Sequence, residues 1–236
     1  MIILLLILAV AFLVYGLFFA PVSQLFGSFP YEIKQPATRC IALTFDDGPN
    51  EPYTTELADF LKQQGVKATF FQVGNCVQRF PEVTKRLVND GHMIGNHSLS
   101  HKFTKYLTQP TFKDEITVAQ HIFQEVLGKR PAFFRPPWLF HHPLLFQTVK
   151  QQKLRPVSGR FCYSFEVLQP SAKRIARRTL AKIKPGAIII FHDGYDGKGG
   201  NRCQTIDAVK LVIPALKVQG YEFVTIDKLF DSKPYL

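Results

Sequence analysis

The N-terminal segment lacks charge. Residues 2–20 contain no acidic or basic side chain and are almost wholly apolar. An apolar run of about 20 residues is long enough for a helix that crosses a bilayer. The segment also lacks the small residues of a signal-peptide cleavage site, because Phe18 and Phe19 precede Ala20. We predict a transmembrane anchor over residues 2–20, with a cleaved secretory signal as the alternative.

Several kinds of site are missing as well. Cys40, Cys76, Cys162 and Cys203 are far apart, and no Cys-x-x-Cys spacing is present, which excludes zinc fingers and dithiol redox motifs. Outside the cytoplasm the four could form one or two disulfides, and buried free thiols are equally compatible with the sequence. No glycine-rich phosphate loop follows the first predicted strand, which weighs against nucleotide binding.

Acidic residues are outnumbered, since 18 Asp and Glu face 29 Lys and Arg and give a net charge of +11. A basic surface attracts polyanions. An exported domain rarely meets nucleic acid, so we expect no nucleic-acid partner and favour anionic lipid or an acidic cell-wall polymer. One local cluster, Lys173, Arg174, Arg177 and Arg178, falls on a predicted helix and is interpreted as a solvated face.

The chain alternates between strand-like and helical stretches after a proline-containing segment at 22–38, which we interpret as a linker. Strands are predicted at 40–45, 67–73, 92–95, 132–135, 154–162, 187–191 and 222–225. Helices are predicted at 53–64, 81–90, 112–127, 143–152, 171–182 and 205–219. Such alternation predicts a parallel sheet with helices outside it. About seven units in about 200 residues fit an α/β barrel, and an open doubly wound sheet is the alternative.

Two adjacent carboxylates follow the first strand, at Asp46 and Asp47 in Asp-Asp-Gly-Pro. In α/β folds the carboxyl ends of the strands are where active sites form. Asp-Gly-Pro is also ordinary turn chemistry. Two like charges beside a buried strand nevertheless require a cation or a proton, so the pair is a candidate site.

His97 and His101 are four residues apart, after the predicted strand at 92–95. Histidines at this spacing can project from one face of a helical turn and share a metal. A pair of surface or capping histidines is the alternative. Together with Asp47 they make a set of two imidazoles and one carboxylate, which leaves open positions for water and substrate.

Two further segments follow strands. In Arg135-Pro136-Pro137-Trp138 the prolines have no N–H, so Trp138 supplies the first free backbone donor, which could stabilise an oxyanion. Arg135 could hold a carboxylate, although a rigid proline turn is the alternative. His192 ends the strand at 187–191 and suits a general acid, with a buried structural histidine as the alternative.

Together these segments resemble the polysaccharide deacetylases related to the NodB nodulation protein, carbohydrate esterase family 4. The resemblance runs from residue 39 to residue 229. It implies a distorted (β/α) barrel of about seven strands that acts on N-acetylated sugars, such as N-acetylglucosamine in peptidoglycan or chitin. It divides the chain into an anchor or signal at 1–21, a linker at 22–38 and a deacetylase domain at 39–236.

The resemblance also assigns roles to individual residues. It makes Asp47, His97 and His101 the ligands of a divalent ion, zinc first, with cobalt, nickel or manganese as alternatives. It makes Asp46 the base, Arg135 the residue that tethers the base, and His192 the acid. It places Pro137, Trp138 and Ile190 at the substrate, with Ile190 in an apolar pocket for the acetate methyl group.

The sequence departs from this family in its fourth motif. An Asp-Trp pair is usual there, and its Asp raises the pKa of the catalytic histidine, whereas this chain has Ser164 and Phe165. Without a carboxylate, His192 becomes harder to protonate. Glu166 and Asp193 are the candidates to replace it.

The sequence therefore predicts a metal-dependent hydrolase that removes N-acetyl groups from a polysaccharide containing N-acetylglucosamine. An O-acetyl esterase and a catalytically degenerate carbohydrate-binding protein are the alternatives. We expect a single-pass protein of the cell membrane, or a secreted one if the leader is cleaved. Its catalytic domain is expected outside the cytoplasm, as a monomer.

Overall fold

The protein is built around one parallel sheet of seven strands, here in a computed structural model that describes residues 1–162 and 164–236. The strand order is β5-β4-β3-β2-β1-β6, and β7 pairs with β1. The strands are β1 (Cys40–Asp46), β2 (Thr69–Gln72), β3 (Met93–Asn96), β4 (Phe133–Phe134), β5 (Arg155–Pro156), β6 (Ile188–His192) and β7 (Glu222–Phe223). A parallel bridge from Arg160 to Ile189 brings the chain after β5 beside β6. The two edges of the sheet therefore meet, as in a distorted barrel.

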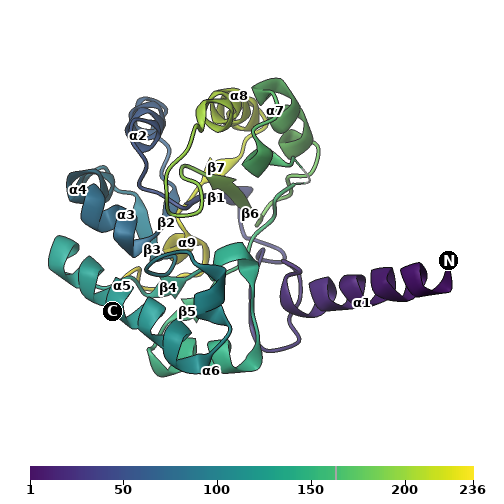
Figure 1. Cartoon of the computed structure of the whole chain (residues 1–236). Helices are drawn as coiled ribbons and strands as arrows, with labels where there is room; N and C mark the ends of the chain where they lie inside the picture. Colours follow the sequence, from purple (N-terminus) through teal and green to yellow (C-terminus); the bar gives the residue numbers. More distant parts are fainter. Residues whose placement is uncertain (163) are drawn as a thin grey trace.

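Most helices lie around the strands, whereas α1 projects away from the domain (Figure 1). The α-helices are α1 (Ile2–Phe18), α2 (Tyr53–Gln63), α3 (Gly74–Arg79), α4 (Pro81–Asn89), α5 (Gln109–Leu127), α6 (Pro143–Gln151), α7 (Ala172–Leu180), α8 (Cys203–Val218) and α9 (Ile226–Leu229). Three short 3-10 helices, η1 (Phe103–Tyr106), η2 (Pro137–Leu139) and η3 (Glu166–Leu168), lie in the loops. The parallel α/β architecture that the alternation predicts is present.

The two faces of the strands carry different side chains: one face packs in the hydrophobic core and the other points into the barrel. Phe45 of β1 stacks on Phe70 of β2 and Phe191 of β6, with ring centroids 5.2 and 6.0 Å apart, and these rings pack with α2 and α8. Successive side chains of a strand point to opposite faces. Thr44 and Asp46 therefore point into the barrel, and Asp46 stands at its carboxyl end.

The prediction of a transmembrane helix over residues 2–20 is wrong. Among the described residues, no helix has both the length and the hydropathy needed to cross a membrane. Helix α1 ends at Phe18, and its 17 residues rise about 26 Å, less than the roughly 30 Å of a hydrocarbon core. The rest of the apolar run leaves the helix because it packs on the domain. The Phe18 carbonyl accepts a hydrogen bond from the His141 N–H (2.9 Å), and the Phe19 ring lies 5.0 Å from Phe140.

Residues 21–33, most of which fall in the stretch interpreted as a linker at 22–38, bond to the barrel. The Ser158 N–H donates to the carbonyl of Pro30 (2.9 Å) and its hydroxyl to that of Pro21 (2.7 Å). Phe29 is fully buried against Phe146. The division at residues 21 and 38 stays a prediction, but this stretch closes the barrel where β5 and β6 meet.

Some elements differ from their predicted bounds. The predicted strand at 154–162 shrinks to β5, because Pro156 has no N–H to continue a ladder. The short helices α3 and α9 were not predicted, since six and four residues are too few to show a helical period. All four cysteines are free thiols in the structure.

Candidate active site

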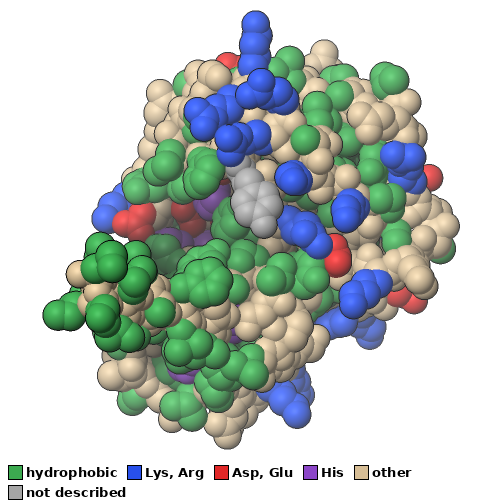
Figure 2. Space-filling view, turned by 90° about the vertical axis from the view of Figure 1, so that its right-hand side faces the viewer, with side chains coloured by type: hydrophobic (Ala, Val, Ile, Leu, Met, Phe, Trp, Pro, Cys, Tyr) green, Lys and Arg blue, Asp and Glu red, His purple; other side chains and the backbone are tan. Residues whose placement is uncertain are grey.

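The predicted residues come together at the carboxyl ends of the strands. Asp46 lies opposite His192 in the pairing of β1 with β6, and His97 and Arg135 directly follow β3 and β4. A cavity of about 470 Å³ opens here, lined by Asp46, Asp47, His97, His101, Pro136, Trp138, Leu139, Phe161, Val167, His192, Tyr195 and Asp196. Histidine and acidic side chains are visible in this hollow in the space-filling view (Figure 2).

Asp47, His97 and His101 offer three ligand atoms that all lie within 4.8 Å of one another. The Asp47 Oδ1 atom is 3.3 Å from His97 Nε2 and 3.1 Å from His101 Nε2. All three residues are buried. Asp47 and His101 have φ values of 75° and 53°, the left-handed region that side chains rarely adopt and that is often found at functional sites.

The other ring nitrogens show that these groups fit a metal ion. His97 Nδ1 lies 2.7 Å from the Arg135 carbonyl, and His101 Nδ1 lies 2.9 Å from Asp196 Oδ1. Each Nδ1 must donate to its oxygen, so in the neutral ring Nε2 carries a lone pair. Both lone pairs face Asp47 Oδ1, which is buried and has no hydrogen bond. Three converging electron-pair donors of this kind are a ligand set for a divalent cation.

The charges at this set agree with that assignment. Burial alone would raise the pKa of Asp47, but the charge that His101 carries when protonated and the close approach of the His101 and His97 rings hold it well below its usual range. Burial likewise opposes protonation of His101, while Asp47 and Asp196 raise its pKa. The residues thus favour positive charge at this point, whether it is carried by a proton or by a metal.

Asp196 is a site residue that the sequence analysis missed. Besides accepting from His101, it donates its backbone N–H to Asp47 Oδ2 (3.0 Å), and it therefore orients two of the three ligands. Its position in the turn-rich stretch 193–197, directly after β6, is the signal that could have identified it.

Asp46 and Arg135 form a buried pair beside the ligands. Arg135 is fully buried, and its Nη1 donates to Asp46 Oδ1 and to Thr44 Oγ1, both at 2.7 Å. Its Nη2 donates to the Ser158 carbonyl (2.8 Å), and its guanidinium lies over the Phe71 ring. Only one Asp46 oxygen receives the guanidinium, so the carboxylate is oriented and its other oxygen can accept a proton.

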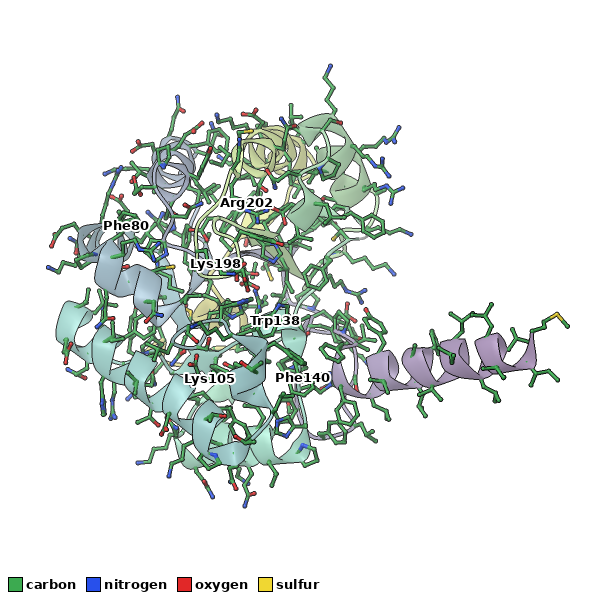
Figure 3. The ribbon with its side chains drawn as sticks, in the orientation of Figure 1. Phe80, Lys105, Trp138, Phe140, Lys198 and Arg202 are labelled. Carbon is green, nitrogen blue, oxygen red and sulfur yellow. The ribbon has the colours of Figure 1, made fainter. Side chains whose placement is uncertain are left out.

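The third motif forms one wall of the cavity. Trp138 lies at the cavity with φ of 56°, 4.4 Å from the His101 ring, and Phe140 lies next to it toward α1 (Figure 3). Pro137 is buried at the start of η2 and is absent from the cavity lining, to which Pro136 contributes. Ile190 is buried in a cluster with Leu139, and it is Leu139 that reaches the cavity.

His192 has a carboxylate partner after all. Its Nδ1 lies 2.6 Å from Oε2 of the buried Glu166, whose other oxygen accepts a hydrogen bond from the Thr205 hydroxyl. Burial disfavours the charged ring, but Glu166 outweighs burial and raises the pKa of His192 to about 9. Glu166, two residues beyond Ser164, thus replaces the carboxylate that the fourth motif lacks.

Asp193, the other candidate, has a different place. Its Oδ2 accepts from the Thr54 hydroxyl (2.6 Å), and burial raises its pKa to about 7. Its carboxylate lies where a Cβ on Gly48 would stand, only 2.1 Å away. Asp193 therefore packs against the Asp-Gly-Pro turn and helps to shape it.

Comparisons with known proteins agree with this geometry. A peptidoglycan-N-acetylglucosamine deacetylase of Bacillus cereus is 34% identical over 196 residues, 83% of this chain and 90% of that protein. A chitooligosaccharide deacetylase of Bradyrhizobium is 32% identical, over 81% of this chain and 91% of that protein. The structure of a family 4 acetyl xylan esterase from Clostridium thermocellum, in complex with cobalt, is 35% identical with a TM-score of 0.72. The match covers 81% of this chain and 90% of that one.

The family model described as polysaccharide deacetylase matches residues 33–157, which include Asp46, Asp47, His97, His101 and Arg135. With relatives above 30% identity along most of its length, the chain belongs to the polysaccharide deacetylase family.

Proposed function

We propose that the protein hydrolyses the N-acetyl groups of a polysaccharide that contains N-acetylglucosamine, releasing acetate and leaving a free amine. The observation that carries the proposal is the pairing on either side of the metal-ligand set. Asp46 is held by Arg135 on one side, and His192 is held by Glu166 on the other, in one cavity. One pair suits a base and the other an acid, as amide hydrolysis requires.

The chain's own residues divide the work as follows. Asp47, His97 and His101 would hold a divalent ion, which when bound polarises a carbonyl and makes water more acidic. Asp46 takes a proton from the attacking water while Arg135 keeps its carboxylate in place. We assign stabilisation of the developing oxyanion to the backbone N–H of Trp138, which lines the cavity. Protonated His192 then gives its proton to the departing nitrogen, the C–N bond breaks, and acetate leaves.

Zinc is the ion we propose. Two imidazole nitrogens and one carboxylate oxygen suit zinc, although cobalt, nickel and manganese accept the same set. Metal analysis of the purified protein, followed by removal and separate return of each ion, identifies the one that restores acetate release.

The activity is tested by acetate release from N-acetylated chitooligosaccharides and from peptidoglycan, with and without chelator. We expect release that stops with chelator and in the Asp47→Ala variant. A chelator-treated protein that keeps full activity would overturn the proposal. If the protein binds these glycans but releases acetate from none of them, it is a degenerate carbohydrate-binding protein instead.

An O-acetyl esterase is the second candidate, supported by the likeness to the acetyl xylan esterase. The leaving group of an ester is an alkoxide, which needs less help from an acid than the nitrogen of an amide does. The Glu166–His192 pair favours the amide, because it keeps a proton ready for a poor leaving group. Rates on acetylated xylan and on chitooligosaccharide, measured in one preparation, distinguish the two.

We further propose that the protein works outside the cytoplasm, where wall polymers lie. Protease treatment of intact cells tests this, with a cytoplasmic protein as control. Loss of the protein from intact cells is the expected result, and full protection would contradict it.

A further inference from the structure

Helix α7 carries a basic face close to the cavity. Lys173, Arg174 and Arg177 are exposed, and Ile175, Ala176 and Thr179 are buried against the domain. Residues three and four apart share one side of a helix, so the three cations lie on one surface. Lys and Arg side chains gather above the hollow that contains the site histidines (Figure 2).

Three cations of this face have no counter-charge among the residues that the structure describes. Within the described part of the chain, Lys173, Arg174 and Arg177 have no acidic partner. Cations on other helices do have one, as shown by the pairs Lys62–Asp90, Arg86–Asp59 and Lys210–Glu56.

The arrangement also disfavours the helix itself. Lys173 and Arg177 are like charges four residues apart, a spacing that destabilises a helix. Lys173 and Arg174 lie in the first turn, where the helix dipole disfavours cations, and no acidic residue occupies that turn. A face that costs helix stability and has no internal partner is suited to an anionic ligand.

The face continues toward the acid side of the site. The Arg178 guanidinium lies 5.7 Å from the centre of the Phe165 ring, and Phe165 is 56% exposed. Phe165 directly precedes Glu166, which holds His192, and Val167 lines the cavity. A polymer on α7 therefore has a short path along residues 165–167 to the reacting atoms.

We propose that the basic face of α7 binds the carboxylates of the substrate strand, so that the preferred substrate is an anionic glycan such as peptidoglycan and not neutral chitin. The inference rests on the proposed function. Peptidoglycan carries carboxylates on its stem peptides, whereas chitin has none. The net charge of +11 adds long-range attraction for the same polymer.

The test compares the full-length protein with a Lys173→Gln/Arg174→Gln/Arg177→Gln variant. Substrates are peptidoglycan strands, the same strands with carboxylates converted to amides, and chitohexaose. On unmodified strands we expect kcat/KM to fall about tenfold, mostly through KM, and to lose most of its salt dependence. On the amidated strands and chitohexaose it stays unchanged, and thermal stability is kept or raised because like charges are removed.

A Lys184→Gln/Lys228→Gln variant is the control, in which two cations outside α7 are removed. Both lysines are exposed at the opposite end of the sheet, before β6 and in α9. An equal fall on all three substrates, an equal fall in the control, or no fall on unmodified strands would overturn the proposal. The proposal would also be overturned if the α7 variant lost binding only to a phosphate polymer such as teichoic acid and kept its binding to peptidoglycan.

Co-sedimentation with insoluble peptidoglycan, against chitin beads, separates this inference from the proposed function. If the wild type releases no acetate but the α7 variant still loses binding to peptidoglycan alone, the function fails and the docking surface stands. If acetate is released and binding is indifferent to the variant, the docking surface fails alone.

Discussion

At the scale of single residues, Glu166 governs when His192 carries a proton. The two groups are 2.6 Å apart, and their side chains are 12% and 3% exposed, so the charge of Glu166 is little screened from the histidine. The pKa of His192 rises from its ordinary 6.5 to about 9, although burial alone would lower it. The acid therefore stays protonated at neutral pH.

Replacing Glu166 by Gln removes that charge and keeps the shape. We expect the alkaline limb of the rate profile for amide hydrolysis to move from near pH 9 toward lower pH, because burial then dominates. Ester hydrolysis should change less. A pH profile of kcat/KM on both substrates measures this. Thr205→Val is the milder control, because it removes the hydroxyl that bonds Glu166 and Gln169 and leaves the Glu166 carboxylate in place. An alkaline limb that does not move would contradict the assignment.

The same pair contributes to folding with a defined sign. A histidine whose pKa is raised in the folded state stabilises the protein fully below the unfolded pKa. That contribution is lost as the pH rises from about 6.5 through about 9. Urea unfolding at pH 6 and pH 9.5 should show a smaller decrease in stability for Glu166→Gln than for the wild type. Equal decreases would argue against the pair.

Asp196 orients two ligands without being one. Changing it to Ala should weaken metal affinity by about 10–100-fold, the usual effect of removing a partner of a ligating histidine. Competition with a chromophoric chelator measures the affinity. Lys198→Ala is the control, since Lys198 pairs with Asp196 from the exposed side and touches no ligand. An unchanged affinity in the Asp196 variant would show that His101 is oriented by other contacts.

At the scale of elements, the strand ends decide what the sequence can reveal. Asp46, Asp47, His97, Arg135 and His192 all end or follow short buried strands, so motif and position could be predicted together. Glu166 starts η3 and Asp196 lies in a turn after β6, and their partners are 26 and 95 residues away. The sequence offers Glu166 as one of two candidates and gives Asp196 only a place after a strand, so the fold decides which contacts they make.

The N-terminal segment shows a limit of prediction from hydropathy. Its lack of charge up to Ala20 suggested a membrane helix, but hydropathy does not show where a helix ends. Phe18 and Phe19 turn onto the barrel through Phe140 and His141. The aromatic residues at the end of the apolar run are the ones that attach it to the domain.

A substitution at Phe29 tests whether the packing of residues 21–33 on the barrel stabilises the domain. It is fully buried against Leu139, Phe146 and Ile190, so Phe29→Ala should lower the free energy of unfolding by about 3–5 kcal/mol. Urea denaturation measures the loss. Leu25→Ala, at a position 64% exposed in the same segment, should change little. A loss below about 1 kcal/mol for Phe29→Ala would contradict an integral role for the segment.

At the scale of the whole molecule, the fold keeps charge in two separate places. Buried charges at the site are arranged in pairs or around the metal ligands, where each pairing fixes a protonation state. Basic residues exceed acidic ones over the whole chain, with a net charge of +11, and exposed cations are concentrated on α7. The first arrangement provides the chemistry, and the second selects which polymer reaches it.

In the proposed function, Asp47, His97 and His101 hold the metal on which acetate release depends. The most direct measurement is metal content and acetate release on the same samples of the wild type, Asp47→Ala and His97→Ala. We predict about one metal per wild-type chain, loss of metal and activity together in both variants, and recovery of the stripped wild type when the ion is returned. Acetate release that survives in variants without bound metal would contradict the account.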